Sequence, residues 1–188
     1  MSDRPGTGHL LVIVGPSGAG KDTLIDGLRT RYDDDPRGLF VQRTVTRPAQ
    51  PGAEDHASLS FDAFAAAERS GRFAVTWDAN GLRYGLPAAV HAHLSTGGLA
   101  IANGSRQALP AIRAAFPALT VVAVEVDEAE LRRRLDARGR ETPAEIEARL
   151  ERARSQPITG DDIVRLDNSG PPEAAIAALA GMVAARLG

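Results

Sequence analysis

Short apolar runs alternate along the chain with segments of helical periodicity, and this pattern predicts the fold. The runs are continuous, as in strands buried on both faces, and fall at 9–14, 39–41, 73–77, 98–102 and 119–126, with a weaker one at 162–166. Amphipathic patterns predict helices between them, at about 21–32, 60–70, 87–95, 106–116, 128–138, 143–155 and 172–187. Strands and helices that alternate in this way indicate a three-layer α/β fold with a mostly parallel sheet and helices on both faces.

Proline and capping residues mark the starts of three predicted helices. Pro87 and Pro172 suit a first helical turn, and Thr142 and Glu145 have the spacing of a capping box. The segment at about 43–60 breaks the alternation because it is rich in proline, glycine, alanine and charge. We expect it to be an irregular flap that faces the substrate rather than a linker between domains.

The composition limits the class of protein. With 188 residues, 43% of them apolar and 24% charged, the chain suits one soluble globular domain that covers residues 1–188. A formal net charge of −2 argues against general binding of nucleic acid. There is no cysteine, which excludes disulfides, thiolate metal sites and a cysteine nucleophile. The first apolar run is too short to cross a membrane and no signal-peptide cleavage pattern follows it, so we expect a cytoplasmic protein without a membrane partner.

Residues 15–23 read GPSGAGKDT and carry the strongest motif. Gly15, Gly20 and Lys21 have the spacing of a Walker A phosphate loop between a predicted strand and a predicted helix. In such a loop, backbone N–H groups converge on phosphate oxygens, and the lysine neutralises charge as the γ-phosphoryl group moves. The alternative is a glycine-rich turn that binds no ligand. Lys21 is the only lysine in the chain, and every other basic residue is arginine. A compact ammonium differs from a planar guanidinium where a cation must enter a tight phosphate site, so the retained lysine favours phosphate binding. The ATP-binding residues that we predict here are Gly15, Pro16, Ser17, Gly18, Ala19, Gly20, Lys21, Asp22 and Thr23.

Asp22 stands where this motif usually has a hydroxyl residue that coordinates Mg²⁺. A carboxylate oxygen also suits that ion. The acidic residue that often ends a later strand in such proteins is replaced here by the neutral Asn103. We therefore predict that Asp22 is the protein's ligand for the Mg²⁺ bound with ATP. The alternative is an acidic residue in the first turn of a helix, which the helix dipole favours by about 0.3–1 kcal/mol.

The order of the further motifs resembles that of guanylate kinases. After the phosphate loop come VQRTVTRPAQPGAED, FAVTWDANGLRYGLP and LRRRLDARGRETPAEIEARLERA, and the resemblance extends from His9 to the last helix. It implies a P-loop nucleoside-monophosphate-kinase fold, with a flap for the acceptor at about 43–95 and an arginine-bearing lid at about 132–155.

The lid segment keeps its arginines. The resemblance implies that Arg134, Arg138 and Arg149 are catalytic, because arginines that close over the transferring phosphoryl group stabilise its charge. The alternative is a solvated helix face with pairs between residues four apart, namely Glu128 with Arg132 and Glu130 with Arg134.

The acceptor flap departs from the guanylate kinase pattern. Arg47 matches the first of two phosphate-clamping arginines, but the second position holds Gln50. The positions that read guanine in that family fall on Val75, Leu86 and Asn103. A guanine edge that lacks its hydrogen-bonding partners is poorly discriminated. We therefore do not expect GMP to be the acceptor.

These departures resemble the ribose 1,5-bisphosphate phosphokinases of bacterial phosphonate breakdown. The segments GKD, TRP, WDANGLRYG, NGSR and RGRE follow the order of that family. The resemblance implies transfer of the γ-phosphate of ATP, with Mg²⁺, to the 1-phosphate of ribose 1,5-bisphosphate, which gives 5-phosphoribosyl diphosphate. Since the attacking phosphate oxygen is already ionised, no general base is needed.

A small sugar with two phosphates needs cations and hydrogen-bonding partners. Candidates for the phosphates are Arg43, Arg47, His56, Arg83 and Arg106. Candidates for the sugar hydroxyls are Asp78, Asn80, Asn103 and Ser105. Tyr84 is a candidate for the pocket wall, and Asn168 resembles an asparagine on the nucleotide side. The alternative for each of them is a polar group of a loop or surface.

Two other functions stay open. A guanylate or other nucleoside-monophosphate kinase would prefer a nucleotide such as GMP as acceptor. A guanylate-kinase-like scaffold that binds partners without catalysis would be expected to lack Lys21 or the lid arginines, and this chain has both. The partner that we expect is a small phosphosugar, and a homodimer is compatible with the sequence.

Overall fold

The computed structural model describes residues 8–48, 56–139 and 141–188. Its main sheet is parallel throughout, in the strand order β2-β7-β1-β8-β9. The strands are β1 (His9–Val14), β2 (Gly38–Val41), β7 (Leu99–Asn103), β8 (Leu119–Glu125) and β9 (Ile163–Asp167). The predicted strands of this sheet, and the α/β fold class, are confirmed.

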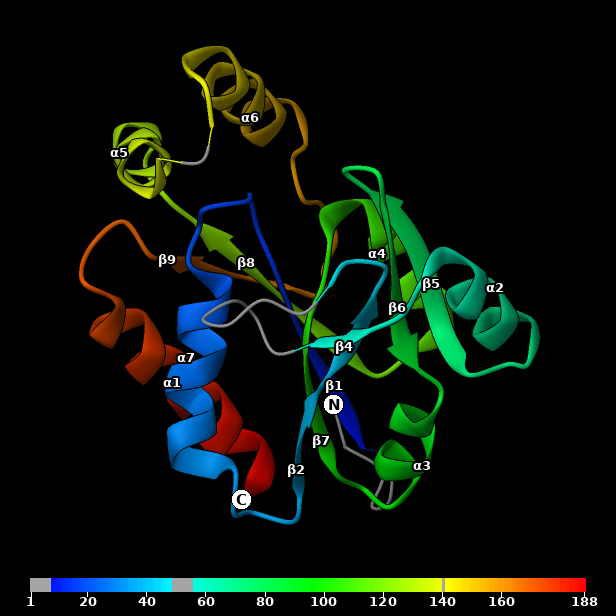
Figure 1. The fold of residues 1–188 in the computed structure, drawn as a ribbon. Coiled ribbons are helices and arrows are strands. Elements are labelled where there is room, and N and C mark those ends of the chain that lie inside the picture. Colours follow the sequence, from blue (N-terminus) through cyan, green and yellow to red (C-terminus); the bar gives the residue numbers. More distant parts are fainter. Residues whose placement is uncertain (1–7, 49–55, 140) are drawn as a thin grey trace.

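Helices cover both faces of this sheet. They are α1 (Lys21–Tyr32) and α7 (Pro172–Leu187) on one face, and α3 (Ala89–Ser95) and α4 (Leu109–Ala115) on the other. Leu11 and Ile13 of β1 belong to the first core, whereas Leu10 and Val12 belong to the second, because successive strand residues point to opposite faces. Figure 1 shows α1 and α7 side by side, away from α3.

A second, smaller sheet occupies the segment predicted to be the flap, and we keep that name for it. Its order is β4-β3-β6-β5, and its strands are β3 (Arg43–Val45), β4 (His56–Ser58), β5 (Phe73–Ala79) and β6 (Leu82–Pro87). Helix α2 (Phe61–Arg69) packs on it through Phe64, whose ring stacks on Phe73 with centroids 4.6 Å apart. The expected irregular segment at 43–60 thus contains two short strands, which is a correction. Gln50 and its neighbours at 49–55 lie outside the described residues.

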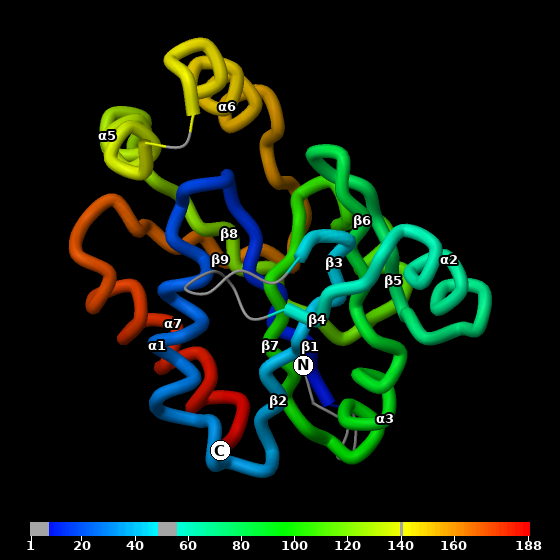
Figure 2. Tube along the Cα trace, in the orientation of Figure 1, coloured from blue at the N-terminus to red at the C-terminus, as the bar shows by residue number. Residues whose placement is uncertain are grey.

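Two further helices occupy the segment predicted to be the lid, and we keep that name for them. These are α5 (Glu128–Arg138) and α6 (Pro143–Ser155), which pack on each other through Leu131, Leu135, Ile146 and Leu150. This cluster is separate from the two cores of the main sheet. Figures 1 and 2 show both helices standing off the body of the molecule, at the end where β8 finishes.

The structure tests the predicted helix starts one by one. Pro172 is the first residue of α7, and the capping box of α6 is present between Thr142 and Glu145, so both predictions are confirmed. Pro87, by contrast, ends β6 opposite Phe73, and α3 begins two residues later, because strand pairing continues through the proline. The helix predicted at 106–116 is a short 3-10 turn, η1 (Arg106–Ala108), followed by α4. Within the described residues, no helix has the length and apolar character needed to cross a bilayer.

Candidate active site

The carboxyl ends of the parallel strands carry most of the predicted site. The phosphate loop follows β1, Asn103 ends β7, and Asn168 follows β9. The end of β8 leads directly into the lid helix α5. In open parallel sheets, ligands bind at this edge, so the topology brings the predicted nucleotide side of the site together.

The phosphate loop has the backbone conformation that its glycines permit. Gly18 and Gly20 lie in the left-handed region, with φ of 97° and 86°. A Cβ at Gly20 would lie 2.7 Å from the side-chain nitrogen of Asn168. The Lys21 ammonium donates hydrogen bonds of 3.0 Å to the carbonyls of Gly15 and Pro16. The only lysine therefore lies over the loop that would hold the phosphates.

Asn168 supports the loop from the end of β9. Its side chain is buried and donates a hydrogen bond of 2.7 Å to the carbonyl of Ala19. Its backbone N–H donates to the carbonyl of Glu125 at 2.8 Å. The sequence placed Asn168 on the nucleotide side, and the structure puts it against the phosphate loop, where its side-chain nitrogen fixes the loop backbone.

Asp22 and Asn103 meet beside the loop. The side-chain nitrogen of Asn103 donates a hydrogen bond of 2.7 Å to a carboxylate oxygen of Asp22. The amide oxygen of Asn103 is buried, and no described residue hydrogen-bonds it. Carboxylate and amide oxygens are hard ligands that suit Mg²⁺. The described residues contain no group of three or more histidine, cysteine or acidic side chains that could hold a metal. Asp22 and Asn103 can offer oxygen ligands to such an ion, and its remaining ligands would have to come from nucleotide phosphates and water.

Two of the predicted lid arginines contact the loop or its support. Arg149 of α6 donates to the Ser17 hydroxyl at 2.6 Å and pairs with Glu141 at 2.9 Å. Arg134 of α5 donates to the carbonyl of Asn168 at 2.7 Å. The lid thus contacts the phosphate loop through Arg149 of α6, and the residue that supports the loop through Arg134 of α5.

The remaining charges of the lid form surface pairs. Hydrogen bonds from Arg133 and then Arg134 lower the pKa of the Glu130 carboxyl to about 2, so the pair of Glu130 and Arg134 exists as its spacing predicts. Arg132 instead pairs with Glu147 across the two helices, and Glu128 with Arg154. Arg138 lies exposed at the end of α5.

The inner face of the flap, which packs on the core of the main sheet, carries a buried arginine. The rings of Trp77 and Tyr84 stack with centroids 5.4 Å apart, and the Arg43 guanidinium lies over both, at 6.0 and 5.3 Å. His56 is opposite Arg43 in the strand register and lies 3.4 Å from the carbonyl of Arg47. The structure therefore brings together three predicted acceptor-side residues, Arg43, His56 and Tyr84, and places the main chain of Arg47 beside them.

The outer face of the flap holds other candidates. Arg83 directly precedes Tyr84 on β6 and therefore points to the opposite face. There it pairs with Glu68 of α2 at 2.9 Å and with Asp78 at 3.3 Å. Asn80 has a φ of 52° and forms the turn between β5 and β6 with Gly81. The structure does not bring Arg83, Asp78 or Asn80 to the inner face with Arg43.

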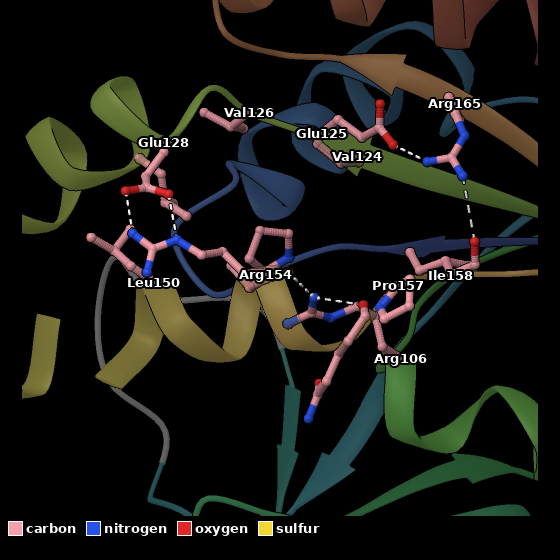
Figure 3. Close-up of a pocket in the computed structure, with 14 residues that line it drawn as sticks. Arg106, Val124, Glu125, Val126, Glu128, Leu150, Arg154, Pro157, Ile158 and Arg165 are labelled. Carbon is pink, nitrogen blue, oxygen red and sulfur yellow. Dashed lines mark hydrogen bonds and ion pairs between the residues drawn. The ribbon is translucent and has the colours of Figure 1, made fainter. Parts of the chain in front are cut away.

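Ser105 and Arg106 lie just beyond β7. Ser105 is half-buried at the start of η1. Arg106 does not point to the flap, because its guanidinium donates to main-chain carbonyls at the end of lid helix α6. Arg106 lines a pocket of about 360 Å³ at the base of the lid. Figure 3 shows its place among the lining residues.

Comparisons with known proteins now identify the family. The chain is 48% identical over 184 residues to the ribose 1,5-bisphosphate phosphokinase PhnN of Rhizobium etli, with 94% of this chain and 92% of that protein covered. It is 47% identical over 165 residues to the protein of the same name from Agrobacterium fabrum, covering 87% and 90% of the two chains. The chain belongs to the ribose 1,5-bisphosphate phosphokinase family. No protein-family model matches it.

The solved structures support the same fold. A guanylate kinase from Anaplasma phagocytophilum superposes with a TM-score of 0.70 over 96% of this chain and 86% of that one, at 17% identity. At this identity the likeness concerns the fold alone. The guanylate kinase-like fold expected for this member of the ribose 1,5-bisphosphate phosphokinase family is confirmed.

One residue of the site was missed at the sequence level. Glu141 is mostly buried, and its carboxylate pairs with Arg149 of the lid. Its other carboxylate oxygen is buried and has no hydrogen-bonding partner among the described residues. The segment RGRE helped to mark the ribose 1,5-bisphosphate phosphokinase resemblance, but nothing in its spacing indicated that Glu141 holds Arg149.

Proposed function

We propose that this chain uses ATP to phosphorylate the 1-phosphate of ribose 1,5-bisphosphate, which gives 5-phosphoribosyl diphosphate and ADP. The observation that carries the proposal is the 48% identity to a ribose 1,5-bisphosphate phosphokinase over nearly the full length of both chains. The phosphate loop with its lysine and the two lid arginines beside it supply the machinery that such a transfer requires. We place the enzyme in the cytoplasm, where ATP is available.

Each contact of the nucleotide side has a chemical role in this proposal. The loop from Gly15 to Gly20 would bind the phosphates of ATP, and Lys21 would leave its carbonyl partners to contact the γ-phosphate. Asp22 would hold Mg²⁺, which when bound withdraws charge from phosphate oxygens. Arg134 and Arg149 would stabilise the charge that spreads over the transferring group.

The flap supports a phosphosugar rather than a nucleotide as acceptor. Val75 and Leu86, which stand at guanine-reading positions, are buried in the apolar core with exposed fractions of 5% and 1%. They offer a base no hydrogen bond. Arg43 and His56 are paired on adjacent strands of the flap sheet, and Arg47 follows β3 with its carbonyl 3.4 Å from His56. Side chains of these types suit a phosphate.

The test of the proposed function is a comparison of acceptors. The protein is incubated with ATP, Mg²⁺ and either ribose 1,5-bisphosphate or GMP, and the product is identified by ³¹P NMR and mass spectrometry. We expect kcat/KM to favour ribose 1,5-bisphosphate by about 10² or more, because the polar groups of guanine would lose their hydrogen bonds to water without replacement, at a cost of about 1–3 kcal/mol for each group. Equal or higher kcat/KM with GMP would contradict the proposal. A preparation with Lys21→Ala controls for contaminating kinases.

The two faces of the flap give a second prediction. We expect Arg43→Ala to raise KM for ribose 1,5-bisphosphate by about tenfold, since a charge-assisted hydrogen bond contributes about 1.5–3 kcal/mol. We expect Arg83→Ala chiefly to lower the midpoint of thermal unfolding, by a few degrees, because Arg83 ties β6 to α2 through Glu68. Steady-state kinetics and calorimetry on both variants check this. A larger increase in KM from Arg83→Ala than from Arg43→Ala would reverse the assignment.

The same ion pair predicts a pH dependence. Hydrogen bonds from Thr76 and then Arg83 hold the pKa of the Glu68 carboxyl below its ordinary value of 4.5. A lowered folded pKa stabilises the protein above pH 4.5, and this contribution is lost as the pH falls through the folded pKa. Glu68→Gln should therefore reduce the loss of stability on acidification below that pH.

A further inference from the structure

Arg106 joins the main sheet to the far end of the lid. Its Nη1 donates to the carbonyls of Ala153 and Gln156, both at 3.1 Å, and its Nη2 donates to the carbonyl of Arg152 at 3.2 Å. Arg106 belongs to η1, directly after β7, whereas its partners end α6. Figure 3 shows the guanidinium against the last turn of that helix.

The chemistry of a helix C-terminus explains the contact. The last carbonyls of a helix have no partner within it, and they form the negative end of the helix dipole. A guanidinium is a planar fork with five N–H donors, so one arginine can reach several of these carbonyls at once. Burial lowers the pKa of the Arg106 guanidinium, which agrees with partners that are neutral carbonyls.

Within the described residues, a pocket separates the base of α6 from the sheet at this point. The pocket of about 360 Å³ lies between the lid helices and the sheet, lined by Val124, Leu131, Leu150, Pro157 and Ile158. Where such a space remains, apolar side chains do not pack the helix tightly against its support. The hydrogen bonds of Arg106 cross this region and connect the two parts.

The anchored end of α6 is close to the lid arginine that contacts the loop. Arg149 precedes Ala153 by about one helical turn, or roughly 6 Å along the axis, and its Nη1 donates to Ser17. On the other side, Arg106 follows Asn103, which bonds Asp22 at the start of α1. The last residue of β7 thus contacts the carboxylate of Asp22, and the turn that follows contacts the helix that carries Arg149.

We infer that Arg106 is a positioning residue, which anchors α6 to the end of β7 and so places Arg149 over the phosphate loop. It does not bind the acceptor phosphate in this arrangement. The inference rests on the proposed function for its kinetic consequences, but the anchor itself is a property of the fold.

The kinetic test uses Arg106→Ala, Arg149→Ala and the double variant. We expect Arg106→Ala to lower kcat by about tenfold and to change KM for ribose 1,5-bisphosphate by less than about twofold, because a misplaced group costs rate rather than binding. In the Arg149→Ala background the same change should cost less than about twofold, since residues that act through one another are not additive. An acceptor KM raised by about tenfold, or full additivity with Arg149→Ala, would overturn the inference.

Two further variants separate anchoring from charge. Arg106→Lys keeps the positive charge but lacks the planar fork that reaches three carbonyls. If Arg106 is an anchor, kcat of Arg106→Lys should be as low as that of Arg106→Ala. If Arg106 were a phosphate ligand, the lysine would recover part of the activity. This variant also keeps the test decisive if Arg106→Ala folds poorly. Arg165→Ala is the matched control, because Arg165 lines the same pocket but pairs with Glu125 rather than with α6.

Hydrogen exchange tests the anchor without reference to activity. We expect amides of residues 143–155 to exchange faster in Arg106→Ala and Arg106→Lys than in the original protein or in Arg165→Ala. Unchanged amide exchange in both Arg106 variants would contradict the proposal that Arg106 anchors α6. If the original protein fails to phosphorylate ribose 1,5-bisphosphate, the proposed function fails, while the exchange measurement still decides whether Arg106 anchors α6.

Discussion

Lys21→Ala is expected to lower kcat by about 10³ or more, the largest loss that any single substitution in this chain should cause. The ammonium lies 3.0 Å from two carbonyls of the loop, Gly15 and Pro16, where phosphate oxygens would converge. A loss of this size corresponds to about 4 kcal/mol of transition-state stabilisation. Steady-state kinetics with saturating ATP and acceptor measure it.

The control for charge is Lys21→Arg. A guanidinium keeps the positive charge but is wide and planar, whereas an ammonium is a compact point charge. We therefore expect Lys21→Arg to lose at least about 10² in kcat despite the retained charge. Recovery of most of the activity in this variant would show that charge alone is needed, and would contradict the argument from shape.

The presence of a single lysine permits a direct test of ligand binding. An amine-reactive reagent can modify only Lys21 and the N-terminal amine. Modification of Lys21, followed by mass spectrometry of its peptide, should be slowed by ATP in a concentration-dependent manner and should abolish activity. Modified protein that retains activity would place Lys21 outside the reaction.

The sequence predicted the main sheet and its helices closely because their signals are local. A strand buried on both faces, such as His9–Val14, is a continuous apolar run, and α6 starts at a capping box that can be read directly. The flap strands gave no such signal. Strands β3 and β4 have only three residues each and pair with each other across a long intervening segment, so their formation depends on tertiary contacts.

The candidate site could be predicted where its residues are contiguous and not where side-chain direction decides. The phosphate loop is a single motif, and its lysine and glycines lie together as expected. Arg83 and Arg106 were predicted as phosphate ligands only because they are positively charged. Strand register turns Arg83 toward Glu68, and the turn after β7 aims Arg106 at α6. Neither direction is encoded in a short motif.

Asp22→Asn is expected to lower kcat/KM for ATP by about 10²–10³ and to raise the Mg²⁺ concentration needed for half-maximal activity. The carboxylate of Asp22 accepts a hydrogen bond from Asn103, so the two side chains lie next to each other beside the loop. Proteins with this motif usually carry a hydroxyl after the lysine and an acidic residue on a later strand. Here the two positions hold a carboxylate and an amide instead.

Exposed Asp26, one turn further along α1, supplies the control. Asp26→Asn removes the same charge from the same helix without touching Asn103. It should leave the Mg²⁺ dependence unchanged, which separates a local ligand from a general effect of charge. An unchanged Mg²⁺ dependence in Asp22→Asn would remove the metal role of this carboxylate.

The exchange of chemical groups between the two positions gives the sharper experiment. Asn103→Asp alone should be strongly impaired, because two carboxylates within hydrogen-bonding distance repel each other and raise the pKa of one of them. Asp22→Ser alone should also be impaired, since it removes the carboxylate. The double variant, with Asp22→Ser and Asn103→Asp, returns one carboxylate to the same place. We expect its kcat/KM to exceed that of either single variant by about tenfold, and its ATP affinity by calorimetry to depend on Mg²⁺ again. A double variant no better than the single ones would mean that the position of the carboxylate along the chain, and not its position in space, is what the site requires.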